Sequence, residues 1–259
     1  MVLLRSLLWV LVLVAARGAD LTAEEAAPKE PRSTSPPPAP AEPDPAKEEK
    51  PAPKPGSLEA YLAMLDRSNR AIRTLRVPYV QERKVRISRR LRKASGRFTL
   101  EIRKAPLGPR VLFEETKPHR MDLLFTDTKV VFHDAVRGQI DVCDPRKGGV
   151  KPSEIWVIGR PLSELRKQYT ITMSTMTAAE TKIYLTKLRM VPRSQAVLKW
   201  VKELFVWLRV GDALPLKTMI ISPSGEYQIF TFQADRLERN VRLDPGTFSL
   251  ESAVPTKSG

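Results

Sequence analysis

The side chains that could carry out chemistry in this sequence are few and scattered. Ser222 and Ser224 flank a turn marked by proline and glycine, and a serine nucleophile there would need a histidine base beside it. The chain has two histidines, His119 and His133, and the sequence gives neither an evident partner. The Gly-x-Ser-x-Gly turn that exposes the serine of many hydrolases is absent. Nucleophilic hydrolysis is therefore not indicated.

The other reactive side chains also fit structural roles. Glu114 with Glu115, and Asp141 with Asp144, are most simply solvated carboxylates. Cys143 is the only cysteine, so the chain has no intramolecular disulfide and no Cys-x-x-Cys metal or redox motif. A small buried residue is a better reading of this cysteine than a reactive thiol. We predict that the protein is not an enzyme and holds no cofactor and no metal.

The stretch from Gly96 to Asp134 supplies the elements that could position a binding site. Apolar side chains alternate there with polar ones over short segments separated by turn-length gaps. Such alternation is typical of an antiparallel meander with one apolar face and one solvated face. The positions on the apolar face are Phe98, Leu100, Ile102, Val111, Phe113, Met121, Leu123, Phe125, Val130 and Phe132.

Helical and further strand signals surround this meander. Residues Ser57 to Leu75 carry apolar side chains at three- and four-residue spacings, which predicts an amphipathic helix capped by Ser57. A second short helix is predicted at residues 161–168. Strands are predicted at 169–174, 183–190, 204–210, 216–222 and 226–233, with a last short strand beginning at Phe248. Residues 204–210 are apolar on both faces, which indicates a cover on each side or a cavity wall.

The predicted fold class is mainly β (α+β). About eleven antiparallel strands would form a curled, incompletely closed β-barrel with helical lid elements. A hydrophobic cavity between sheet and helices follows from that arrangement.

The chain of 259 residues divides into three parts by composition. Residues 1–18 have a basic start, an apolar run too short to span a bilayer comfortably, and small residues at a cleavage site. These features predict a cleaved secretory signal peptide. An uncleaved anchor is the alternative. Residues 19–56 contain eleven prolines among 38 positions and predict a disordered linker. This linker is either an inert spacer or a segment that crosses cell-wall material or docks a partner. Residues 57–259 form the folded domain.

The charge of the chain is concentrated in that domain. The whole chain carries +15, and the acidic linker leaves the domain at +16 once Arg5 and Arg17 are set aside with the leader. Such a surface favours transient contact with anionic membranes. Nucleic acid is not an expected partner, because an exported protein rarely meets it.

An ordered set of motifs resembles the LolA-type family of periplasmic outer-membrane lipoprotein carriers. No single motif is specific, and the resemblance rests on their order along roughly residues 58–255. Thr128 departs from the family, which usually has glycine there, and His133 stands in place of its tyrosine. The matching segments are Tyr79-Val-Gln81, Ser95-Gly-Arg-Phe98, the basic loop 103–110, Phe113 to Pro118, Leu124 to Asp127, Val130 to Asp134, Leu188 to Pro192, and Leu214 through Gly225 to Asn240 and Phe248.

The resemblance implies a carrier whose open barrel holds lipoprotein acyl chains in transit from the inner to the outer membrane. The expected helix of the lid includes Leu58, Leu62 and Leu65, and its tethering arginine is either Arg103 or Arg110. The residues expected to line the acyl-chain cavity are Phe98, Leu100, Ile102, Phe113, Leu123, Phe125, Phe132 and Trp207.

The resemblance also implies partners and a location. Lipoproteins would bind through their acyl chains, an inner-membrane complex would release them to the carrier, and an outer-membrane receptor would accept them. The protein is expected to be a periplasmic monomer. The alternative is an envelope sensor or regulator with the same fold that binds a lipid or a protein as its signal.

Overall fold

The structure, a computed structural model, describes residues 54–85, 88–103, 108–126, 128–144 and 157–252. The predicted signal peptide and nearly all of the proline-rich linker lie outside these ranges. None of the helices within them is long and apolar enough to cross a membrane.

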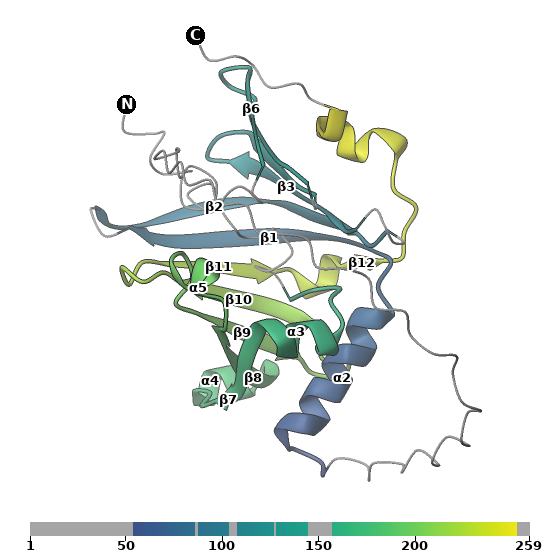
Figure 1. Ribbon diagram of the computed structural model, residues 1–259, viewed down its shortest axis with the longest axis vertical. Coiled ribbons are helices and arrows are strands. Elements are labelled where there is room, and N and C mark those ends of the chain that lie inside the picture. The colour runs from purple at the N-terminus through teal and green to yellow at the C-terminus, as the bar shows by residue number, and fades with distance from the viewer. Residues whose placement is uncertain (1–53, 86–87, 104–107, 127, 145–156, 253–259) are drawn as a thin grey trace, which may run out of the picture.

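Strands dominate the described part of the chain, as the alternation of apolar and polar residues predicts (Figure 1). The strands are β1 (Thr74–Val85), β2 (Ser88–Glu101), β3 (Arg110–Lys117), β4 (Met121–Phe125), β5 (Val130–Asp134), β6 (Gln139–Cys143), β7 (Tyr169–Ser174), β8 (Tyr184–Pro192), β9 (Glu203–Arg209), β10 (Pro215–Ile221), β11 (Tyr227–Phe232) and β12 (Glu238–Arg239). The helices are α2 (Leu58–Arg70), α3 (Leu162–Gln168), α4 (Ala178–Thr181), α5 (Gln195–Leu198) and the 3-10 segments η3 (Ala234–Arg236) and η4 (Pro245–Ser252).

All twelve strands belong to one antiparallel sheet that does not close. The strand order is β6-β5-β4-β3-β2-β1-β11-β10-β9-β8-β7, with β12 beside β1. The chain therefore starts in the middle of the sheet, runs out to β6, crosses to the opposite edge at β7, and returns to pair β11 with β1. The edge strands β6 and β7 are not neighbours, which confirms the predicted incompletely closed, mainly β fold.

Strand alternation gives this sheet two chemically different faces. We call the inner face the one that carries Leu75, Tyr79 and Phe98, and the outer face the opposite one. The inner face holds two apolar clusters, one over β1–β5 and β11 and one over β7–β9. A third, smaller cluster lies on the outer face of β3–β6.

Helix α2 begins as predicted and ends earlier. The Ser57 hydroxyl accepts a hydrogen bond from Ala60 N at 3.2 Å, so Ser57 is the N-cap. The helix ends at Arg70 rather than near Leu75, because from Thr74 onward the backbone pairs with β2 in the sheet. Leu75 thus contributes to the sheet core rather than to the helix face.

The expected final strand at Phe248 is wrong. Residues 245–252 form the 3-10 segment η4, which follows Pro245 and Gly246. Phe248 is buried on the outer face against Leu112, Leu124 and Val131. This segment lies beside β3–β6 in Figure 1, away from helices α2 and α3.

Candidate functional site

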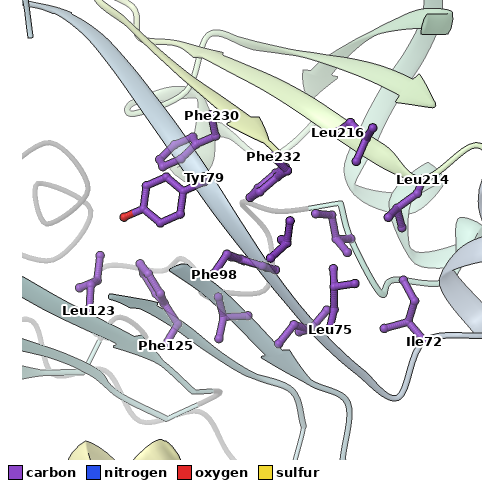
Figure 2. Close-up of a cluster of buried hydrophobic side chains, with 14 of the residues drawn as sticks. Ile72, Leu75, Tyr79, Phe98, Leu123, Phe125, Leu214, Leu216, Phe230 and Phe232 are labelled. Carbon is purple, nitrogen blue, oxygen red and sulfur yellow. The ribbon is translucent and has the colours of Figure 1, made fainter. Parts of the chain in front are cut away.

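Six aromatic rings that contact one another lie on the inner face of the sheet and form the candidate site. We call this group the aromatic face. Figure 2 shows Leu123 and Phe125 of β4 facing Tyr79 and Phe98 across it. Phe113 is the hub, with ring centroids 5.1 Å from Phe98, 5.7 Å from Tyr79, 5.6 Å from Phe230 and 6.1 Å from Phe125. The rings are those of Tyr79, Phe98, Phe113, Phe125, Phe230 and Phe232.

Register explains why these rings meet. Tyr79 of β1 pairs with Phe232 of β11, and Phe98 of β2 pairs with Phe113 of β3. Phe113 in turn pairs with Leu123 of β4. Neighbouring strands thus place large apolar side chains in one row across the inner face, at the short cross-strand spacing that lets them touch.

Most of the predicted cavity residues come together on this face. Phe98, Leu100 and Leu123 are buried in its cluster. Phe125 and Phe132 are buried there too. Ile102 and Phe113 are partly buried and pack against the same cluster.

Trp207 is a correction, because it lies on the outer face. It is the cross-strand partner of Lys187 and of Lys217, and both ammonium groups sit over its ring, at 4.7 and 4.6 Å from the centroid. Its indole Nε1 donates to Glu180 Oε1 at 2.7 Å. The other side of β9 contributes Leu204 and Val206 to the inner face. The strand is apolar on both sides because both sides are covered, which was one of the two alternatives that the sequence left open.

Phe230 and Phe232 belong to the site and were not among the predicted cavity residues. Both are buried beside Tyr79 and Phe98. Their alternation within residues 226–233 was visible in the sequence. What could not be read there is that β11, far along the chain, pairs with β1 in the middle of the sheet.

The predicted lid helix packs over the other half of the inner face. Leu62 and Leu65 of α2 are buried in the cluster over β7–β9, and Leu58 packs against it. Helices α3 and α5 contribute Leu165 and Val197 to the same cluster. By contrast, within the described ranges no side chain of the aromatic cluster comes from a helix.

Residues 157–160, in the connection between β6 and β7, join the two halves of the inner face. Val157 lies in the helix-covered cluster and Ile158 in the aromatic cluster. Gly159 packs so closely over the sheet that a Cβ there would lie 2.8 Å from Ile102 Cδ1 and 3.0 Å from Leu100 Cδ2. Its φ of +77° also favours glycine. The segment therefore forms part of the cover of the aromatic face.

Asn69 holds this segment to helix α2. The side chain is 2% exposed, and its Nδ2 donates to the carbonyl oxygens of Val157 at 3.0 Å and Arg160 at 2.8 Å. Its Oδ1 accepts from Gly159 N at 3.0 Å. The preceding turn of α2 holds the start of α3, since Asp66 Oδ1 accepts from Leu162 N at 2.7 Å. Sequence reasoning missed these two polar side chains because their partners are backbone groups about ninety residues away.

In the described part of the chain the two candidate arginines contact η4, a segment other than the helix that they were expected to tether. Arg103 Nη1 and Arg110 Nη1 bind the two oxygens of Glu251 in η4, at 3.2 and 2.8 Å. Arg110 also pairs with Glu101 and lies 4.2 Å from the ring centre of Phe248. Although partial burial acts in the opposite direction, the two guanidiniums hold the pKa of the Glu251 carboxyl below its ordinary value. The two arginines fasten η4 to the outer face.

Three of the side chains considered for catalysis, Ser222, Ser224 and Cys143, make contacts within the sheet and its turns. Ser222 accepts from Glu226 N at 3.2 Å and lies 2.8 Å from the Ser224 hydroxyl, which closes the β10–β11 turn. Cys143 Sγ donates to Val130 O at 3.5 Å, and burial raises the pKa of this thiol to about 12. At neutral pH the sulfur is therefore a thiol rather than a thiolate nucleophile.

A contact between a histidine and an aspartate lies on the outer face. His133 Nδ1 and Asp122 Oδ2 are 3.0 Å apart and belong to paired positions of β4 and β5. Within the described residues, no three histidine, cysteine, aspartate or glutamate side chains gather as a metal site.

No protein-family model and no curated protein matches the sequence. Several solved structures are similar. The complex of Pseudomonas aeruginosa MucA and MucB matches at 14% identity and a TM-score of 0.40, over 74% of this chain and 60% of that chain. A putative outer membrane lipoprotein-sorting protein domain from Vibrio parahaemolyticus matches at 9% and 0.41, over 73% of this chain and 96% of that one. A LolA superfamily protein from Nitrosomonas europaea matches at 10% and 0.36, over 73% and 96%.

These matches are similarities only, and no property of those proteins is transferred to this chain. This chain spans 60% of the length of the chain it matches in the MucA and MucB complex. What the protein binds is argued from its own side chains.

Proposed function

We propose that the protein is an exported, non-catalytic carrier that binds the acyl chains of lipoproteins on the aromatic face and moves them from the inner to the outer membrane. The observation that carries the proposal is the unequal cover of the inner face. Helices α2, α3 and α5 pack over β7–β9, whereas the aromatic cluster of the described chain contains no helical side chain.

An acyl chain suits this face for physical reasons. Each methylene removed from water contributes about 0.8 kcal/mol, without any directional bond to the protein. Edge-on aromatic rings present a broad apolar surface against which a flexible chain can lie. The partly buried Phe113, at the centre of the rings, is the side chain best placed to contact such a chain.

The basic surface supports the second part of the proposal. A domain charge of +16 would attract the protein to anionic membranes, where acylated cargo is collected and delivered. The predicted signal peptide would deliver the protein to the periplasm. An inner-membrane releasing complex and an outer-membrane receptor are the partners that such a carrier requires.

The test is native mass spectrometry with lipid extraction on gently purified protein. We expect bound acylated species that disappear in Phe113→Asp and persist in Phe205→Asp. Phe205 is the matched control, because it is also a partly buried phenylalanine but lies on the outer face beside Trp207. Circular dichroism would verify that both variants fold.

A protein that carries no lipid and takes up no synthetic lipopeptide would contradict the carrier proposal. Capture of an envelope protein by such a lipid-free protein would favour a sensor or regulator, in which the same face binds a partner.

A further inference from the structure

The aromatic face ends in polar side chains toward the turn between β1 and β2. Gln81 and Arg83 follow Tyr79 at alternate positions of β1 and so share its inner face. Gln228 of β11 is the partner of Arg83 and is within 3.4 Å of Gln81, Nε2 to Oε1. Glu115 of β3 lies on the same face, two positions after Phe113. The inner face therefore has an apolar body and a polar end.

Arg83 is the unusual member of this polar end. Its Nη2 atom is buried and has no hydrogen-bond partner, and among the described residues no carboxylate forms an ion pair with it. Burial, aided by the nearby Arg92, lowers the pKa of the guanidinium to about 10, so the group stays charged at neutral pH. The other charged groups near it are Glu115 and Glu226.

A buried, charged donor without a partner is costly, and folded proteins seldom keep one without a reason. The guanidinium fork matches the oxygens of a phosphate group. The amides of Gln81 and Gln228 lie beside it and can donate to the same group. Burial raises the pKa of the Glu115 carboxyl to about 7, so this neighbour does not fully neutralise Arg83.

We infer that Arg83 binds the phosphate of an acyl-bearing lipid whose chain lies on the aromatic face. The inference rests on the proposed function, since the chain must occupy that face. The spacing fits: Arg83 lies eight residues beyond Leu75 along β1, roughly 26 Å at a rise of about 3.3 Å per residue. One leaflet of a bilayer's hydrocarbon core is about 15 Å thick, so a chain and its headgroup fit within that length.

The experiment compares two soluble lipids that share a chain and differ in the headgroup. The delipidated protein is titrated calorimetrically with 1-myristoyl-lysophosphatidylglycerol and with 1-monomyristoylglycerol, both below their micelle concentrations. We expect the phosphate-bearing lipid to bind about tenfold more tightly or better, as a charge-assisted hydrogen bond to a buried donor predicts.

Variants assign that preference to Arg83. Arg83→Gln should remove the difference between the two lipids, and Arg83→Lys, which keeps the charge without the fork, should retain part of it. Arg97→Gln is the matched control and should leave the preference intact. Arg97 is an exposed arginine of the neighbouring strand β2, adjacent to Phe98 and so on the outer face.

Each contrary result has its own meaning. Equal affinity for the two lipids in the unmodified protein, or a preference that survives Arg83→Gln, overturns the inference and leaves the carrier proposal standing. Binding of neither lipid overturns the inference, and failure to take up a synthetic lipopeptide as well contradicts the proposed function itself. Inorganic phosphate is the last arm: if it binds with the same dependence on Arg83 and displaces the lipid, the site takes free phosphate and the lipid assignment is wrong.

Discussion

The two halves of the inner face bury their apolar side chains in different ways. Over β7–β9, leucines of α2 and α3 fill the space above aliphatic strand residues such as Leu188 and Leu204. Over β1–β5 and β11, aromatic rings pack edge to face, and the described cover is limited to short contributions such as Ile72 and Ile158. One half buries aliphatic side chains between helices and strands, and the other buries aromatic rings against one another.

Because of this difference, we expect the helix-covered half to contribute to stability and the aromatic half to contribute to lipid binding. Substitutions under the helices should lower the free energy of unfolding and leave the lipid affinity of the folded protein unchanged. Substitutions among the rings should lower the lipid affinity of the folded protein as well as the free energy of unfolding, because most of the rings are buried too. The predictions below test that separation.

The largest effect is expected at Leu65, a fully buried side chain of α2. Leu65→Ala should lower the free energy of unfolding by about 3 kcal/mol, through lost transfer energy and the cavity left behind. Urea denaturation measures this loss, and calorimetric titration with lipid measures the affinity. A large loss of affinity in the folded variant would show that the two halves are not independent.

Asn69 tests the connection between the halves. Asn69→Ala removes three hydrogen bonds to the 157–160 segment and leaves buried backbone groups unpaired, which should cost about 2–3 kcal/mol of stability. Because the same segment packs over Leu100 and Ile102, lipid should also exchange faster. Stopped-flow transfer of a fluorescent lipid from vesicles measures that rate.

The control for Asn69→Ala is Asp66→Asn, which alters the neighbouring contact to α3 but leaves the segment's own hydrogen bonds in place. Unchanged lipid exchange in Asn69→Ala, despite the lower stability, would contradict a role for the segment in covering the aromatic face.

The outer face supplies a smaller test. Glu251→Gln weakens the contact of η4 with Arg103 and Arg110 and should lower the free energy of unfolding by about 1 kcal/mol at pH 7. The pKa of Glu251 is lowered in the folded protein, so the carboxylate stabilises the fold above its ordinary titration range. The difference between variant and parent should therefore shrink as the pH falls below about 4. Lipid affinity should not change, because η4 covers the opposite face.

The sequence predicted the sheet well and the covers poorly, and the reason is physical. Alternation is a local property of each strand, so Phe98, Phe113 and Phe125 could be assigned to one face before their partners were known. Trp207 alternates just as clearly, but its strand is apolar on both sides. Only its pairing with Lys187 and Lys217 shows that its side chain lies on the outer face.

The covers depend on contacts between distant segments. Arg103 and Arg110 were predicted as alternative tethers of the lid helix, but both bind Glu251, which lies more than 140 residues away. Asn69 and Asp66 carry no motif, because each acts on backbone groups of a segment whose position follows from the crossover between β6 and β7. Tertiary placement, not local pattern, determined these parts of the site.

The smallest effect, and the sharpest for the aromatic half, concerns the pH dependence set by Glu115. Its pKa is raised by burial from 4.5 to about 7, with only partial compensation from Arg83. A carboxyl whose folded pKa exceeds its unfolded value binds more protons in the folded state. Its contribution to the free energy of unfolding is therefore greatest below about pH 4.5 and declines as the pH rises toward 7. The side chain is partly exposed, which reduces the expected decline to roughly 1 kcal/mol.

Glu115→Gln should flatten this decline between pH 5 and pH 8, measured by urea denaturation at each pH. Glu114→Gln is the matched control, because Glu114 is the neighbouring residue on the outer face, paired with Asp122. If the control flattened the profile equally, the effect would come from the overall charge rather than from the inner face. If Glu115→Gln left the profile unchanged, the polar end would be more open to water than its burial indicates, and Arg83 would have less reason to need a ligand.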